Sequence, residues 1–493
     1  MTTSTAAAAL ARVAVVNGPE GNDLDWHNID WRQVEDDVRR LRQRIFTATQ
    51  AGDLKRVRSL QKLMLRSRAN TLLSVRRVTE INAGRKTAGV DGEVVLSSAA
   101  KAELVDRVQY PAEPWQARPV KRVYIPKRGA TGKQRPLGIP VIVDRVLQAR
   151  VVNALEPEWE ARFEPRSYGF RPGRGCHDAI DAIFHVARGA NPKRQWVLDA
   201  DLAAAFDRID HPYLLAQLGA FPARGLIAGW LKAGVIEKGR YAPTGEGTPQ
   251  GGVVSPLLLN IALHGMEQAA GVRYQVTGTH AGDTVSGSPV LIRYADDLVA
   301  LCHTRDEAQQ VKARLAGWLA PRGLTFNEDK TRIVTLDDGF DFLGFTVRRQ
   351  SDKLLIKPSK AALRRIRETA THRDARPARG QRDRGDRPAQ PRHPGLGRLL
   401  PDGGVQRRVH RAGSLPVAAH LQVGQARSPE QAEALDHQQV LRRVQQVPAG
   451  PVGVRRPRQR RLPHQVRLDR HRPAPDGQGR FVPGRSRSGS VLG

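Results

Sequence analysis

The stretch Val290-Leu-Ile-Arg-Tyr-Ala-Asp-Asp-Leu-Val-Ala-Leu301 places two adjacent carboxylates between two apolar runs. Both runs are long enough for short strands, so the pattern predicts a β-hairpin that carries Asp296 and Asp297 in its turn. Burying strands beside paired negative charge is costly unless a cation lies there. The stretch therefore predicts either a divalent-metal site or an ordinary Asp-Asp turn, and it leaves both open.

A second acidic stretch follows the apolar run that begins at Trp196. Trp196-Val-Leu predicts a short strand, and Asp199 and Asp201 would share one of its faces if the strand continues. A helix begins soon afterwards, so a capping role is the alternative, because Asp is a favourable N-cap residue. Together with the two acids of the hairpin, Asp201 would give three carboxylates on two strands. Such a set can bind two divalent ions about 4 Å apart, and Mg²⁺ prefers carboxylates combined with phosphate oxygens.

Residues 121–140 predict a basic hairpin, in which two short strands flank a glycine-containing loop. Six Lys and Arg side chains decorate it, among them Lys127 and Arg135. Such side chains can bind a triphosphate or a nucleic-acid backbone, although a generic basic loop has the same composition. Further along, the Gly251-Gly252 pair precedes a predicted helix and would let the backbone approach a ligand closely.

The formal net charge is +31, and the leading explanation is a polyanionic partner such as nucleic acid. From Asp30 to about Asn82, predicted amphipathic helices carry Arg and Lys opposite their apolar faces, which a solvated surface also explains. Two cysteines, Cys176 and Cys302, exclude a disulfide framework, so we expect a reducing, cytoplasmic location. We expect neither a signal peptide nor a membrane-spanning run.

Taken in order, the motifs resemble those of the reverse transcriptase/maturase proteins encoded within group II introns. The resemblance runs from about Asn82 to Glu368, and it depends on the succession of motifs more than on any single one. The matching motifs are Arg135-Pro-Leu-Gly-Ile-Pro140, Tyr168-Gly-Phe-Arg-Pro172, Asp199-Ala-Asp201 with Phe206-Asp207 and Ile209-Asp-His211, Thr248-Pro-Gln-Gly-Gly252, Tyr294-Ala-Asp-Asp297 and Phe342-Leu-Gly-Phe345.

The resemblance implies an α+β fold, namely a right-hand polymerase with fingers and an antiparallel-sheet palm that bears the acids. The expected parts are a flexible N-terminus (1–29), an N-terminal helical extension (30–115), fingers (116–195), palm (196–347), the start of a thumb (348–368) and a C-terminal tail (369–493).

The resemblance also assigns roles to individual residues and implies Mg²⁺ as the cofactor. It implies that Asp201, Asp296 and Asp297 are catalytic metal ligands and that Lys330 donates a proton to pyrophosphate. Lys127 and Arg135 would contact the triphosphate, and Phe206 would exclude a ribose 2′-hydroxyl. Gln250 and Gly251 would line the nucleotide and template pocket.

The implied function is an RNA-directed DNA polymerase of a group II intron, with maturase-type RNA binding that supports splicing and retrohoming. Its partners would be the intron RNA, a DNA primer or target, and deoxynucleoside triphosphates, with no membrane. One alternative is a non-enzymatic splicing cofactor that only binds the intron RNA. Viral RNA-directed RNA synthesis is disfavoured by the bulky Phe206 at the sugar-facing position.

The tail differs from the thumb that the resemblance implies. Residues 372–493 contain no Lys, Ile, Asn, Thr, Met, Tyr or Trp. A natural arginine-rich disordered RNA-binding tail is one reading. We interpret the segment as translation in a slipped frame, because back-translation read one base later restores Trp, Tyr and Lys and resembles the family's thumb and maturase region. This hypothesis predicts a lost thumb, a disordered tail, and weak or no processive synthesis.

Overall fold

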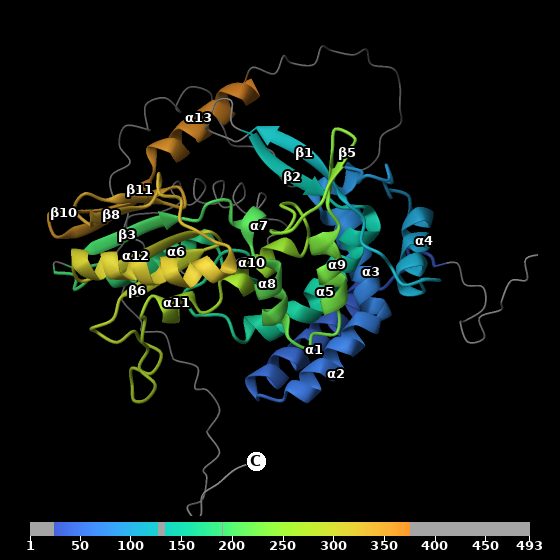
Figure 1. Cartoon of the computed structure of the whole chain (residues 1–493), viewed down its shortest axis with the longest axis horizontal. Helices are drawn as coiled ribbons and strands as arrows, with labels where there is room; N and C mark the ends of the chain where they lie inside the picture. Colours follow the sequence, from blue (N-terminus) through green and yellow to red (C-terminus); the bar gives the residue numbers. More distant parts are fainter. Residues whose placement is uncertain (1–23, 127–133, 190, 375–493) are drawn as a thin grey trace, which may run out of the picture. The chain divides into compact units, whose positions relative to one another are not determined.

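The computed structural model describes residues 24–126, 134–189 and 191–374, all within the first of the chain's two units, Met1–Asp436 (Figure 1). Lys127 therefore lies outside the described residues, and so does nearly all of the segment 369–493 that we interpret as frame-shifted. None of the helices in the described ranges has the length and apolar character needed to cross a membrane.

Trp26 packs the start of the described chain onto the N-terminal helices. Its side chain is 4% exposed, and its indole Nε1 donates a hydrogen bond to Glu80 (2.8 Å). Residues 24–29 thus join the folded part, and the flexible segment predicted for residues 1–29 does not include them.

The predicted N-terminal helices form around apolar residues that recur at three- and four-residue steps. Asp30 caps the first one, since its side chain accepts a hydrogen bond from the backbone N–H of Gln33 (3.0 Å). The last of these helices is buried on nearly every side, and it buries polar side chains as well as apolar ones. The buried polar side chains have hydrogen-bond partners, as when Asp144 accepts from Trp115 and Arg150 donates to the carbonyl of Val108. The elements are α1 (Trp31–Gln50), α2 (Leu54–Arg66), α3 (Arg68–Arg76), η1 (Arg77–Ile81), η2 (Ala83–Lys86), α4 (Ser98–Gln109) and α5 (Ile142–Glu160).

A four-stranded antiparallel sheet in the order β6-β7-β3-β8 carries the acids. Alternate residues face two different cores: Leu198 and Leu298 pack in the same core as residues of one covering helix, α12, whereas Val197 and Val299 pack with residues of another, α6. Because both faces are covered, the strands read as continuous apolar runs. The elements are β3 (Trp196–Asp201), β6 (Val290–Tyr294), β7 (Asp297–Cys302), β8 (Arg332–Thr335), α6 (Cys176–Ala187) and α12 (Arg305–Leu319).

A second sheet has the order β2-β1-β4-β5 and departs from the expected division of the chain. The hairpin of β1 (Val120–Pro126) and β2 (Gln134–Ile139) was expected to form the fingers, whereas β4 (Val235–Glu237) and β5 (Arg240–Ala242) fall in the range expected for the palm. Val120 nevertheless pairs with Val235 in parallel, so the two ranges share one sheet.

A third sheet, in the order β11-β10-β9, follows the acid-bearing sheet along the chain. It leads into α13, which begins at Lys360, in the range expected to start the thumb. The remaining elements are α7 (Ala205–Arg208), α8 (His211–Leu218), α9 (Arg224–Lys232), α10 (Ser255–Ala262), α11 (Met266–Ala269), η3 (Ala320–Arg322), β9 (Phe340–Phe342), β10 (Phe345–Gln350), β11 (Lys353–Pro358) and α13 (Lys360–Asp374).

Candidate active site

The predicted hairpin forms, and its register brings the three acids together. Tyr294 pairs with Asp297 across the turn of β6 and β7, which leaves Ala295 and Asp296 as the two turn residues. Asp201, the last residue of β3, pairs with Asp297 on the neighbouring strand. The backbone N–H of Leu202 also reaches the carbonyl of Asp296 (3.3 Å). Asp201, Asp296 and Asp297 therefore meet at one end of the sheet.

Burial and mutual repulsion act on these carboxyls. Burial is the largest cause that raises the pKa of Asp296, and the charge of Asp201 adds to it. The pKa of Asp297 is raised further, again first by burial and then by the charges of Asp296 and Asp201. Concentrated negative charge in a partly desolvated place destabilises the ionised forms. A cation bound at this place would stabilise the ionised carboxylates.

Lys330 supplies part of that compensation. Its ammonium donates a hydrogen bond to Asp201 Oδ2, and this bond is the largest cause that raises the pKa of Lys330. Asn327 holds the turn that carries the lysine, because its backbone N–H donates to the carbonyl of Asp201 (2.8 Å) while its own carbonyl accepts from the N–H of Lys330 (3.0 Å). Sequence reasoning missed Asn327, although its place three residues before Lys330 in a turn was a usable signal.

The donor chemistry fits Mg²⁺. The three side chains offer only carboxylate oxygens, which Mg²⁺ prefers together with substrate phosphates. Within the described ranges, no three His, Cys, Asp or Glu side chains already form a cluster that could hold a metal ion. Lys330 occupies one side of Asp201 instead. The residues therefore match the ion in kind, and ion binding would require the acids and Lys330 to adjust.

Two residues predicted for the nucleotide pocket lie in a loop that the main chain holds closely. The carbonyl of Gln250 accepts a hydrogen bond from the N–H of Gly138 on β2 (2.7 Å). Gly251 has φ +111°, which favours glycine, and a Cβ there would lie 3.0 Å from the Gly138 carbonyl oxygen. Gln148 on α5 adds a hydrogen bond from the N–H of Val253 to its Oε1 (2.8 Å). Gln148 was not predicted, because this contact joins residues 105 positions apart.

Phe206 lies beside this loop. It is part of the short helix α7, and its carbonyl accepts a hydrogen bond from the N–H of Thr248 (2.5 Å). Its ring meets that of Phe170 edge-on, with 6.1 Å between centroids. Arg135 on β2 faces the acids closely enough for its charge to lower the pKa of Asp296. Phe206 is thus joined to the loop of Gln250 and Gly251 through Thr248, and Arg135 acts on the acids through its charge. Lys127 lies outside the described residues.

A cavity of about 330 Å³ opens beside the acids. Its lining includes Asp201, Asp297 and Lys330, together with Phe342 and Leu343 from β9 and the turn after it. The Phe342-Leu-Gly-Phe345 motif follows the acid-bearing motifs along the chain, and its first two residues also lie next to Asp201 and Asp297 in the structure.

Comparisons with known proteins match most of the described part of the chain. The family described as "Reverse transcriptase (RNA-dependent DNA polymerase)" matches residues 125–347, and the "N-terminal domain of reverse transcriptase" matches residues 26–108. Protein YkfC of Escherichia coli is 33% identical over 335 residues, which cover 62% of this chain and 87% of YkfC. The group II intron-encoded protein LtrA of Lactococcus lactis is 40% identical over 169 residues. This chain belongs to the group II intron reverse transcriptase/maturase family.

The match to LtrA covers 34% of this chain and 26% of LtrA, so the chain spans about a quarter of that relative. Among solved structures, telomerase from Candida albicans in complex with a telomeric RNA fragment aligns with a TM-score of 0.34 and 16% identity, over 50% of this chain and 46% of that one. Likeness at that level carries no conclusion. The α+β fold with its antiparallel palm sheet is confirmed, and by family the chain is an RNA-directed DNA polymerase.

Proposed function

We propose that this chain uses Asp201, Asp296 and Asp297 to extend a DNA primer on a group II intron RNA template. The observation that carries the proposal is the register of the sheet, which pairs Asp201 with Asp297 and places Asp296 beside them. Lys330 and Arg135 bring positive charge to the same place. Carboxylates that converge beside basic side chains are what nucleotidyl transfer from a triphosphate requires.

Each residue has a task that follows from its position. Mg²⁺, when bound, would supply the Lewis acid that activates a primer 3′-hydroxyl and neutralises the triphosphate. The three aspartates would hold it, and Arg135 would orient the phosphates. Lys330, whose raised pKa keeps it protonated, would give a proton to the leaving pyrophosphate.

The sugar of the incoming nucleotide would meet Phe206. The backbone of this residue is fixed by Thr248, and its ring packs against Phe170. A residue fixed at its backbone and packed at its ring cannot move aside easily for a 2′-hydroxyl. Gln250 and Gly251, fixed through Gly138, would form the wall against the base and the template.

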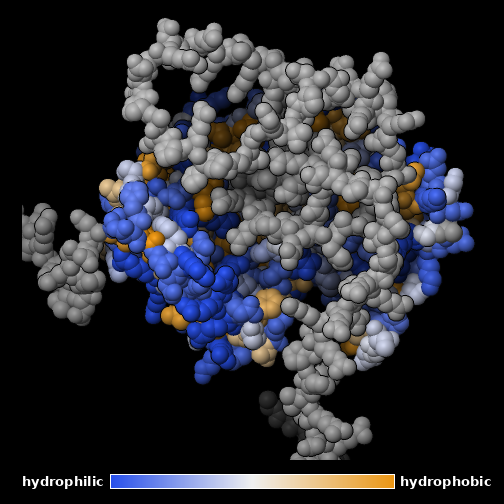
Figure 2. All heavy atoms as spheres, turned by 180° about the vertical axis from the view of Figure 1, so that it is seen from behind, coloured by the Kyte–Doolittle hydropathy of each residue, from blue (hydrophilic) through white to orange (hydrophobic). Residues whose placement is uncertain are grey.

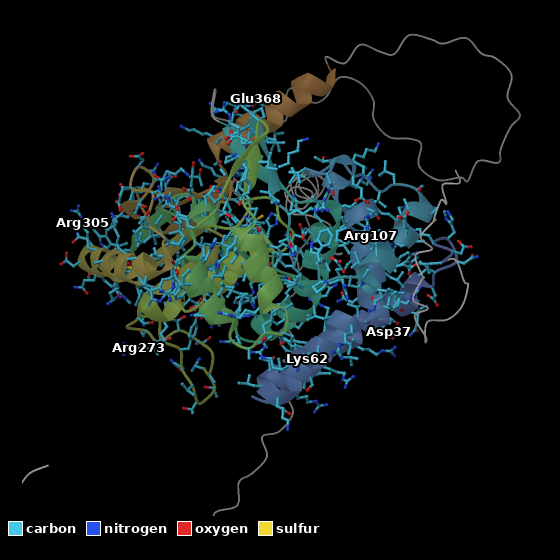
Figure 3. All side chains as sticks on the ribbon, turned by 45° about the vertical axis from the view of Figure 1, so that its right-hand side comes forward. Asp37, Lys62, Arg107, Arg273, Arg305 and Glu368 are labelled. Atoms are coloured by element: carbon cyan, nitrogen blue, oxygen red, sulfur yellow. The ribbon has the colours of Figure 1, made fainter. Side chains whose placement is uncertain are left out.

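The N-terminal helices would bind the intron RNA. Arg39 and Arg40 on α1 have side chains that are 75% and 66% exposed. Charged side chains project from these helices in Figure 3, where Lys62 is labelled on α2. In the part of the face in Figure 2 that grey atoms leave uncovered, hydrophilic residues predominate. Exposed Arg and Lys side chains suit contacts with a phosphate backbone, and we propose that they support splicing and retrohoming.

Primer extension on an RNA template with Mg²⁺ and deoxynucleotides tests the polymerase. We expect incorporation by the wild-type chain and none by Asp297→Asn. Asp283→Asn changes an aspartate side chain that is 70% exposed on a loop and serves as the matched control. Equal extension by both variants would refute the assignment. RNA binding or splicing retained by a wild-type chain that extends no primer would favour the non-enzymatic splicing cofactor.

We also propose that the segment 369–493 arises from a slipped reading frame. Without a thumb, little would hold primer and template over the acids, so the products of the wild-type chain should be short. Sequencing the gene near the codon for Glu368 tests the slip. An uninterrupted frame shared by close relatives, or long processive products, would contradict it.

A further inference from the structure

A buried arginine contacts the turn Ala295–Asp296, which we call the catalytic turn. Arg293 is on β6, three residues before Asp296, and is 2% exposed. Its Nη1 donates hydrogen bonds to Asn260 Oδ1 (2.9 Å) and to the carbonyl oxygen of Ala295 (3.1 Å). Its Nη2 donates to Ser167 Oγ (2.6 Å). One guanidinium thus joins the turn to two other parts of the chain.

The partners of Arg293 are all neutral. Within the described ranges, no ion pair joins it to a carboxylate, and Glu164, Glu267 and Asp296 act on it only through space. Burying a charge without a direct counter-ion is costly. A neutral side chain would fill the space at lower cost, so the forked donor geometry of arginine is the property that this position uses.

The backbone of the turn is strained at Ala295, and contacts on two sides hold it in that conformation. Ala295 has φ +57°, a left-handed conformation that costs a non-glycine residue free energy. On one side, its carbonyl accepts from Arg293. On the other side lies the backbone of Gly169, where a Cβ would come within 2.3 Å of the Ala295 nitrogen. Asn260 fixes Gly169 in turn, since its Nδ2 donates to the Gly169 carbonyl (2.8 Å).

This network links the acids to the nucleotide pocket. Asn260 belongs to α10, the helix that follows the Gln250-Gly251 loop. Gly169 precedes Phe170, whose ring contacts Phe206. One connection from the turn to these two parts runs through the Arg293 side chain and its partner Asn260, and a second is the direct packing of the Gly169 backbone against Ala295.

We propose that Arg293 is a positioning residue that holds the Ala295 carbonyl and thereby sets the direction of the Asp296 and Asp297 carboxylates for metal binding. The inference rests on the proposed function for the reaction that these acids catalyse. The metal-binding step can be measured without that reaction.

The test measures Mn²⁺ binding to the full chain by electron paramagnetic resonance. Template, primer and nucleotide are absent. Arg293→Lys keeps the charge and loses the fork. We expect its Mn²⁺ affinity to fall by about tenfold, the lower end of the effect of removing a residue that orients metal ligands. Arg150→Lys is the matched control, because Arg150 is also buried and donates to main-chain carbonyls of Val108 and Leu65, away from the turn. Equal affinity in the two lysine variants would overturn the proposal.

Ser167→Ala covers the case in which Arg293→Lys fails to fold, because it removes a single hydrogen bond from the same guanidinium. A smaller but measurable loss of Mn²⁺ affinity is expected, and wild-type affinity would overturn the proposal. If the wild-type chain binds Mn²⁺ no more strongly than Asp297→Asn does, the proposal is overturned as well. A wild-type chain that binds Mn²⁺ and yet extends no primer would count against the polymerase function, while the comparison of the variants would still decide the role of Arg293.

Discussion

Asp201 and Asp297 are paired partners in the antiparallel ladder between β3 and β7. Paired residues on neighbouring strands place their side chains on the same face, and a slip of one residue would send one of them to the opposite face. The apolar residues on both faces, packed into two cores, fix this register. The packing of the sheet therefore determines the approach of the two acids.

Stability without metal should fall as the pH rises. The pKa values of Asp296 and Asp297 are raised in the folded chain. As the pH rises, the unfolded chain loses these protons before the folded chain does. Above about pH 4, the ordinary pKa of Asp, the two carboxyls therefore lower the free energy of unfolding. The penalty grows until the folded carboxyls ionise and is constant beyond. We expect the melting temperature in EDTA to fall across this window more steeply for wild type than for Asp297→Asn. Parallel pH curves for the two proteins would contradict this.

Replacing Lys330 should slow catalysis more than it weakens nucleotide binding. The lysine touches Asp201 and is 54% exposed, so Lys330→Gln should fold normally. If it donates the proton to pyrophosphate, kcat should fall by about a hundredfold with little change in KM. Lys312→Gln is the control, because Lys312 also pairs with an acid of the same region, Glu328 (2.6 Å). The check is single-nucleotide incorporation, and a change confined to KM would exclude the proton-donor role.

Phe206→Ala should relax the choice of sugar. The backbone at this position is held by Thr248, so the substitution removes the ring and leaves the loop in place. We expect the ratio of kcat/KM for ribonucleotides to that for deoxynucleotides to rise about tenfold or more, because a steric exclusion is lost. Competition between the two nucleotides on one template measures the ratio. An unchanged ratio would remove Phe206 from the sugar site.

Two glycine substitutions should have opposite effects on stability. In Gly169→Ala, the new Cβ would meet main-chain atoms of Tyr294 and Ala295, which cannot move aside without shifting Asp296. We expect a loss of about 2 kcal/mol or more in the free energy of unfolding, together with weaker Mn²⁺ binding. Gly225→Ala, on α9 with nothing within 4 Å of the new Cβ, should leave stability unchanged or raise it by up to about 1 kcal/mol. Denaturant titration compares them, and losses of equal size would contradict the prediction.

The sequence was most informative where chemistry and local pattern coincide. The hairpin with Asp296 and Asp297 forms as predicted, because apolar runs and a short turn are local signals. Arg293 lies within that predicted hairpin, but its proposed role depends on Asn260 and Ser167, which are 33 and 126 positions away. No local pattern reports such a contact. For the same reason, the pairing of β4 and β5 into the sheet of β1 and β2 could not be predicted.

The parallel pairing of Val120 with Val235 has a consequence for synthesis on the ribosome. The β1–β2 hairpin emerges long before its third strand has been translated. Until residues 235–242 follow, one edge of β1 has no partner, and an open strand edge invites pairing with other chains. Folding of this sheet must therefore wait for more than a hundred further residues to be added, so a nascent chain stalled within that interval should be prone to aggregate.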